Sequence, residues 1–211
     1  MAYPEEIAKL ENEIFCGLRL VDAWEWRIRF LDTLNLDADY SLVWPKFAVW
    51  MLTSDELGLL AIADVQLKSA LYRTVKLHAR TIGGDRPSRE EWSVSRSCAK
   101  TVESIPIEKS PVWYDGRLTD DSSAISNARL AVWWSADPAS SAFSNWAASW
   151  AAEAVSYAAA IAIARPSEES ESWITERANA KSSARISAYT KMADKLISLV
   201  SESPTSQPLC P

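Results

Sequence analysis

Apolar residues recur at spacings of three and four along most of this chain, which is the period of an α-helix. The first stretch with this spacing starts at Pro4 and ends near Thr33. Its apolar seam is Ile7, Leu10, Ile14, Gly17, Val21, Trp24, Ile28 and Leu31. The seam predicts one long helix over residues 4–33, with Gly17 as either a point of close contact or a slight kink.

Turn-forming and helix-capping residues divide the next part of the chain. We expect a loop over residues 35–41 and a short helix over residues 45–50. Ser54 suits the N-cap of a third helix, which runs to Ile82 and is ended by the two glycines that follow. A stripe of leucines, with His78 among them, would face the core.

Prolines divide the second half of the chain into further expected helices, over residues 87–102, 119–136, 138–165 and from Pro166 onward. The stretch 104–117 has two prolines and a Tyr-Asp-Gly turn, so we expect a loop there. No alternation typical of strands occurs. The predicted fold class is therefore all-α, an irregular helical bundle of about six helices.

The same breaks suggest how the chain is organised. Residues 1–84 form an N-terminal helical part, and residues 85–200 form an Ala/Trp-rich helical part packed on it as one domain. The last segment, residues 201–211, is polar and rich in proline, so we expect a disordered tail.

Composition and charge restrict the class of partner. The chain has only five glycines in 211 residues, which argues against the glycine-rich loops that cradle phosphates. Its net charge of −6 argues against nucleic acid as the main ligand, because neutralising phosphates needs a basic face. An acidic surface suits a basic protein target. The sequence leaves open whether the protein forms a homo-oligomer.

The three cysteines are too far apart in sequence to suggest a metal site or a disulfide framework: Cys16, Cys98 and Cys210. The acidic start MAYPEEIAKLENE does not have the layout of a signal peptide. We therefore expect a cytoplasmic protein without metal or other cofactor.

The stretch from Arg129 to Arg165 is built almost entirely of alanine, serine and aromatic residues. It has no Lys or Arg between its ends, but acids, an asparagine and a proline interrupt it, so we expect no membrane span. Its helix has an aromatic face with Trp146, Trp150 and Glu153, and a face of alanines. Both faces suit a core; alternatively, part of the aromatic face lines a pocket or a partner surface.

Three further features are candidates for binding. Eleven tryptophans are far more than usual, and Trp133 and Trp134 leave a helix about 100° apart, so one of them reaches solvent, a ligand or another subunit. Glu153, a carboxylate among rings, needs an arginine partner or binds a ligand. The basic cluster Arg73, Lys76 and Arg80 is either a solvated helix face or a clamp for an anion.

Catalytic motifs do not occur in the sequence. His78 is the only histidine, and its position on an apolar stripe is typical of a hydrogen-bonded core residue. Neither a G-x-S-x-G motif nor a Walker A motif is present. We therefore predict that the protein is not an enzyme, although Glu153 or His78 would be the residue to carry catalysis.

Residues 85–165 contain three features in order: Arg86-Pro87-Ser88, the loop Asp115-Gly116-Arg117-Leu118-Thr119-Asp120, and the Ala/Trp segment. In this order they resemble the alanine- and tryptophan-rich helical proteins of bacteria and their phages. There, a loop ending in Gly-x-x-Thr-Asp precedes Ala-Ala-Trp repeats. Some members are classed as immunity proteins of bacterial toxin systems, so the resemblance implies a neutralising role. It implies no particular site residue.

Two functions follow as hypotheses. The first is a non-catalytic bacterial or phage protein that neutralises a toxin or a host defence factor by binding it. The second is a small-molecule sponge, which holds an anionic nucleotide signal between the tryptophans and the Arg73, Lys76 and Arg80 face. Stacking on tryptophan and pairing with arginine suit a nucleotide.

Overall fold

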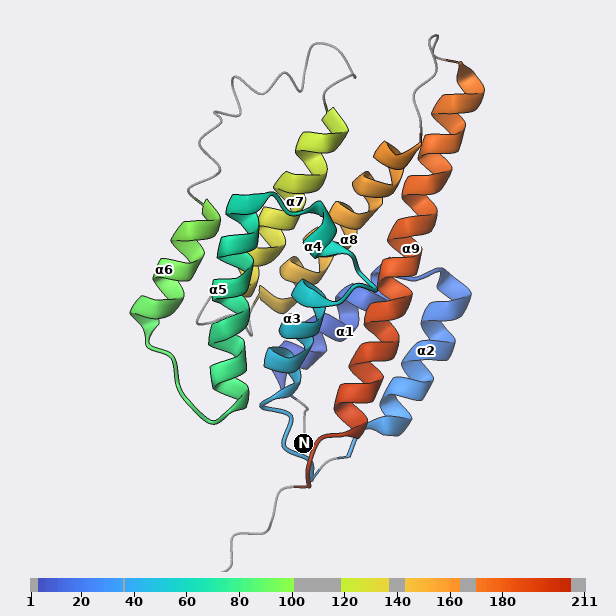
Figure 1. Cartoon of the computed structure of the whole chain (residues 1–211). Helices are drawn as coiled ribbons and strands as arrows, with labels where there is room; N and C mark the ends of the chain where they lie inside the picture. The colour runs from blue at the N-terminus through green and yellow to red at the C-terminus, as the bar shows by residue number, and fades with distance from the viewer. Residues whose placement is uncertain (1–3, 36, 101–118, 137–142, 164–169, 206–211) are drawn as a thin grey trace, which may run out of the picture.

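The computed structural model describes residues 4–35, 37–100, 119–136, 143–163 and 170–205. They form nine helices and no strand, so the all-α class is confirmed, while the expected number of about six is too low. Figure 1 shows their arrangement. The helices are α1 (Glu5–Gly17), α2 (Leu20–Thr33), α3 (Val43–Thr53), α4 (Leu59–Ile62), α5 (Val65–Ile82), α6 (Arg89–Lys100), α7 (Thr119–Ser135), α8 (Ser144–Ala162) and α9 (Glu171–Ser201).

The long helix expected over residues 4–33 is wrong, because the chain breaks between α1 and α2. Leu18 and Arg19 are extended, with ψ angles of 162° and 144°. Ile14 is fully buried on α1, whereas Val21 on α2 is exposed. The apolar seam therefore does not continue on one side of the molecule, although its spacing continues in the sequence.

Gly17 is a point of close contact, as one of the two sequence interpretations had it. It is the last residue of α1, and a Cβ placed there would lie 2.3 Å from the ring of Tyr189 on α9. The Tyr189 hydroxyl donates a hydrogen bond of 2.7 Å to Glu13, which holds the ring across the glycine. The absent side chain thus lets α1 pack directly on α9.

The helix expected from Ser54 to Ile82 is also two helices. Gly58 has a φ of +73°, a left-handed conformation that suits glycine, and the short α4 follows it. Asp64 then caps α5, because its carboxylate accepts a hydrogen bond of 2.7 Å from the Leu67 backbone N–H. A second capping residue inside the predicted span marks the true start of the long helix.

The core is arranged around α8. Its buried face consists of small residues: Ser144, Ala147, Ala148, Ala151, Ala152, Ala154, Ser156 and Ala160. Small side chains let neighbouring helices approach closely, and α7, α9 and α1 all pack on α8 (Figure 1). The core cluster draws residues from Ile7 to Val200, so both halves of the chain share it.

Residues 202–205 follow α9 and contact the loop before α3. Helix α9 ends at Ser201, and the Pro204 carbonyl then accepts a hydrogen bond of 2.9 Å from Asp39. Thr205 bridges to Ala38 in the antiparallel sense. The expected disordered tail is therefore wrong for residues 201–205, while residues 206–211 lie outside the described part of the chain. The expected loop over residues 104–117 lies outside it too.

Replacing Gly17 with alanine is expected to destabilise the protein. The new methyl group would meet the Tyr189 ring, which the hydrogen bond to Glu13 keeps from moving aside. Overpacking of this kind costs about 1–3 kcal/mol of unfolding free energy. Urea unfolding followed by circular dichroism measures the loss.

Gly83→Ala is the matched control for this substitution. Gly83 caps α5 with a φ of −75°, and its Cβ would lie 3.4 Å from the nearest atom, the Arg80 carbonyl oxygen. We expect the urea midpoint of the Gly83→Ala variant to equal that of the original protein within experimental error. Equal midpoints for the two variants would show that the contact between Gly17 and Tyr189 carries no constraint.

Candidate functional site

Four aromatic residues and one arginine form a cluster where α6, α7 and α8 meet. The rings of Trp133 and Trp134 lie 4.4 Å apart edge to face, and Trp134 stacks on Trp146 at 6.2 Å. Phe143 lies 4.8 Å from Trp134, and the Arg96 guanidinium lies 3.7 Å above Trp133. Trp133 and Trp134 are both half-buried, so their rings touch although their backbone positions point apart.

The aromatic face of α8 divides between core and surface. Trp150 packs against the core cluster, whereas Trp146 is 49 % exposed. Of the tryptophans predicted for binding, Trp146 therefore offers the most ring area to a ligand or partner.

Glu153 is paired with arginine, which was one of the two alternatives in the sequence analysis. Its carboxylate lies 2.8 Å from Arg185 on α9 and also accepts a hydrogen bond from Ser156. The pair links α8 to α9 beside the alanine face. Since the carboxylate already has these partners, its place among the rings does not require a ligand.

A second basic series, missed in the sequence analysis, lies along α9. Arg177, Lys181 and Arg185 follow one another every four residues, and each stands over an aromatic ring. Arg177 lies 4.7 Å from the Trp173 ring, Lys181 lies 3.4 Å from the Tyr157 ring, and Arg185 lies 5.5 Å from the Tyr189 ring. The spacing i, i+4, i+8 was the signal for one shared helix face.

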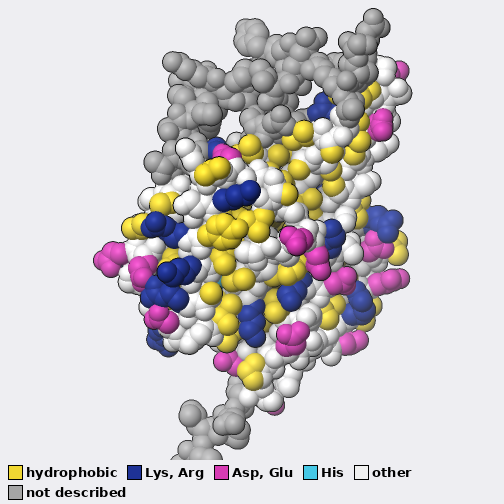
Figure 2. All heavy atoms as spheres, in the orientation of Figure 1, with side chains coloured by type: hydrophobic (Ala, Val, Ile, Leu, Met, Phe, Trp, Pro, Cys, Tyr) yellow, Lys and Arg dark blue, Asp and Glu magenta, His cyan; other side chains and the backbone are white. Residues whose placement is uncertain are grey.

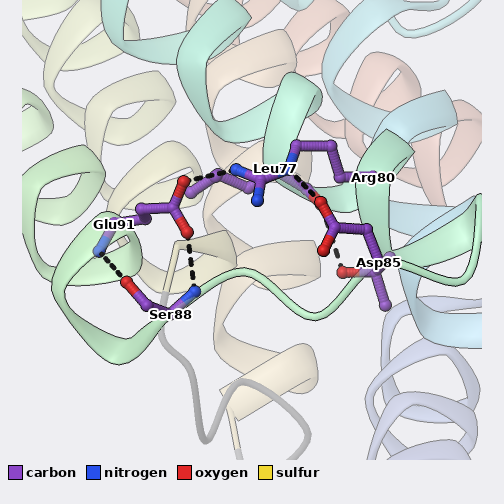
Figure 3. Close-up of polar contacts among 6 residues, drawn as sticks. Leu77, Arg80, Asp85, Ser88 and Glu91 are labelled. Carbon is purple, nitrogen blue, oxygen red and sulfur yellow. Dashed lines mark hydrogen bonds and ion pairs between the residues drawn. The ribbon is translucent and has the colours of Figure 1, made fainter.

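The basic cluster on α5 offers fewer cations than its sequence suggests. Arg80 is paired with Asp85 at 2.6 Å and with Glu91, as Figure 3 shows. The hydrogen bond to Arg80 and that from the Ser88 backbone lower the pKa of Glu91. Arg73 and Lys76 are exposed on the same helix. On the face drawn in Figure 2, basic and acidic side chains lie next to one another.

Ser88 and Glu91 also define where α6 begins. The Ser88 hydroxyl accepts from the Glu91 N–H at 3.2 Å, and the Glu91 carboxylate accepts from the Ser88 N–H at 2.7 Å (Figure 3). This is a capping box, whose S-x-x-E signature stands in the sequence. The helix therefore starts at Arg89 and not at Pro87.

Of the aromatic and basic candidates, Trp133 and Arg80 are engaged in separate clusters. Arg80 contacts Asp85 and Glu91 across the loop between α5 and α6. The Trp133 ring contacts Trp134 and Arg96. A sponge that holds one ligand between Arg80 and Trp133 is therefore not preformed by these contacts.

His78 is a core residue. Its side chain is buried between Trp44 and Trp92, and Nε2 lies 2.8 Å from the Ser135 carbonyl oxygen. Because a carbonyl only accepts, Nε2 carries the proton. Burial lowers the pKa of His78 from 6.5 to about 4, against the opposing effect of the Ser135 carbonyl. The imidazole is thus neutral at physiological pH and shielded from substrate.

The largest unexpected feature is an apolar seam on the outer face of α2. We call the α2 seam the five side chains that are between 50 % and 71 % exposed: Leu20, Val21, Trp24, Ile28 and Leu31. The opposite face of α2 packs inward through Trp26, whose indole N–H donates to the Ala193 carbonyl of α9 at 3.1 Å. The sequence analysis had included Val21, Trp24, Ile28 and Leu31 in the seam of one long helix over residues 4–33.

Lowering the pH from 6.5 to 4 is expected to destabilise the protein through His78. The folded state keeps the imidazole neutral down to about pH 4, whereas the unfolded chain takes up a proton near pH 6.5. The stability is full above pH 6.5 and falls by about 3 kcal/mol towards pH 4. Urea unfolding at several pH values measures this slope.

His78→Gln is the control, because glutamine also donates a hydrogen bond to the Ser135 carbonyl but does not titrate. Subtracting its profile removes the contribution of the carboxylates, which titrate in part of the same range. Parallel profiles for the two proteins would contradict a neutral, buried His78.

Comparisons with known proteins add no relative: no family model, no curated protein and no solved structure matches the chain. The resemblance to Ala/Trp-rich helical proteins therefore stays a prediction. Within the described ranges, no three potential ligands among His, Cys, Asp and Glu lie together as a metal site would need. The described helices also include none that is long and apolar enough to cross a bilayer.

Proposed function

We propose that this chain is a non-catalytic binding protein of the bacterial cytoplasm, encoded by a bacterium or a phage. It neutralises a protein target, a toxin or a defence factor, by occupying the target's surface. The observation that carries the proposal is the α2 seam, which lies on the outside of the bundle.

The composition of the α2 seam suits a protein interface. Leu20, Val21, Ile28 and Leu31 surround Trp24, and tryptophan is enriched among the residues that dominate binding energy. The Trp24 ring is held by Phe15 at 5.3 Å in an edge-to-face contact. An anchored ring loses less conformational entropy on binding than a free one.

The seam adds little to the fold of the isolated chain. Ala23, Trp26 and Phe30 bury the other face of α2, and they supply its packing on the bundle. Contiguous apolar side chains in water usually mark an interaction site. A bound partner is the simplest means of removing this seam from water.

The double variant Ile28→Asp/Leu31→Asp is expected to keep the fold and lose the target. Both side chains are exposed, so carboxylates there should change the melting temperature by only a few degrees. In a pull-down from the host followed by an activity assay on the captured protein, the original chain should bind and inhibit, and the variant should do neither.

Ile174→Asp is the matched control. Ile174 on α9 is 57 % exposed, close to the 60 % of Ile28, but lies on another helix. The Ile174→Asp variant should capture the target and inhibit it as the original chain does. Capture that survives the α2 substitutions, or is lost in all variants alike, would remove α2 as the binding surface.

A second candidate function is a nucleotide sponge, favoured by the cluster around Trp134. Trp146 is half exposed and stacked on Trp134, and Arg96 stands beside them over Trp133. A flat base stacks on an exposed indole, and a guanidinium pairs with phosphate. Here Arg96 takes the role that the sequence analysis gave to the face of Arg73, Lys76 and Arg80.

Nucleotide titration tests this second candidate. Quenching of tryptophan fluorescence and a higher melting temperature are expected with the nucleotide that binds, and Trp146→Phe should weaken both effects because it removes the exposed indole. Trp150→Phe, on the core side of α8, is the control. If no nucleotide changes either signal, the sponge function is wrong.

A further inference from the structure

We infer that the partner of the α2 seam is an amphipathic helix that carries lysine or arginine beside its apolar residues. This inference rests on the proposed function, because it takes the α2 seam as the binding surface. It adds the chemistry and shape of the partner, which follow from the spacing of the seam and from the charges beside it.

The spacing of the seam is that of a coiled coil. Val21, Trp24, Ile28 and Leu31 are separated by three, four and three residues, which places them at a and d positions of a heptad. At 100° per residue, this seam points almost opposite to the buried face formed by Trp26. A second helix can therefore lie along α2 without disturbing the bundle.

The length of the seam sets the length of the partner. From Leu20 to Leu31 the helix rises about 17 Å, or three turns. A partner helix of at least three turns covers it. A strand or a loop would leave the regular a and d spacing unused.

The cations on α2 are already paired. Arg19 lies 2.6 Å from Asp22, Arg27 lies 2.9 Å from Glu11 of α1, and Arg29 lies 3.6 Å from Asp194 of α9. They are therefore neutralised within the chain. We therefore do not assign the attraction of a charged partner to these three arginines.

The acids beside the seam are not paired. Glu25 and Asp32 both follow a d residue, at e positions on one edge of the α2 seam. Both are exposed and form no ion pair within the part of the chain that the structure describes. The available charge along the seam is thus negative and favours a partner with basic flanks.

The same charges oppose a second copy of this chain. In an antiparallel pair, the e positions meet, so Glu25 and Asp32 would face the same acids of the other copy. In a parallel pair, Arg27 would have to reach Asp32 of the other copy and leave Glu11, which is only 2 % exposed. Taking the cation from a buried carboxylate is costly.

The test uses two designed helical peptides of three heptads, with Leu and Ile at a and d. One carries Lys at e and g, and the other carries Glu there. Fluorescence anisotropy of the labelled peptides measures binding to the full chain. The Lys peptide should bind about tenfold more tightly at low salt, and high salt should reduce the difference because it screens exposed charges.

Glu25→Lys/Asp32→Lys should invert this preference, so that the Glu peptide binds more tightly. Glu176→Lys is the control, because Glu176 is an exposed acid on α9, away from the seam, and it should leave the preference unchanged. Ile28→Asp/Leu31→Asp should abolish binding of both peptides. Circular dichroism of each variant confirms that the helices are intact.

The outcomes separate this inference from the proposed function. Equal binding of both peptides, lost in Ile28→Asp/Leu31→Asp, would overturn the basic partner and leave α2 as a binding surface. No peptide binding, together with target capture that survives the same substitutions, would overturn both. A dimer in sedimentation velocity, or binding to phosphatidylglycerol vesicles, that these substitutions abolish would replace the helix by a second copy or a lipid surface.

Discussion

The close approach that α8 allows is the constraint on which the rest of the fold depends. Its buried face carries alanine and serine, so the large side chains of the core come from the helices around it. Trp26, Phe47 and Tyr189 are the fully buried examples. A larger side chain on α8 would push these helices outward together, because protein interiors leave few voids to absorb it.

This packing also decides where α2 lies. Gly17 lets α1 meet Tyr189 on α9, and the chain turns immediately afterwards at Leu18 and Arg19. Helix α2 then returns along α9, where the indole of Trp26 reaches the Ala193 carbonyl. A contact between residues 172 positions apart therefore sets the position of the surface that we propose for binding, although neither Gly17 nor Tyr189 belongs to it.

The features that could be predicted from the sequence are those that depend on residues close together in the chain. Helical periods, the buried His78 and the ion pair of Glu153 could be read from spacing and residue type, and the capping box at Ser88 could have been. The break before α2 could not, because Leu18 and Arg19 are compatible with a helix and become extended through packing. The pairing of Arg80 with Glu91 likewise could not be predicted, because it depends on the conformation of the loop between α5 and α6.

Helix α2 has apolar residues on both faces, so apolar content alone does not decide which face is buried. Polar contacts make that choice. The inner face places the Trp26 N–H on a carbonyl and Arg27 on the buried Glu11, whereas Trp24 on the outer face is 55 % exposed, so that its indole is open to water. Turning α2 over would separate Glu11 from Arg27, which is costly for a carboxylate inside a protein. The apolar face left in water is therefore a consequence of where the polar partners lie, and the acids Glu25 and Asp32 beside it then determine the charge of the surface that a partner meets.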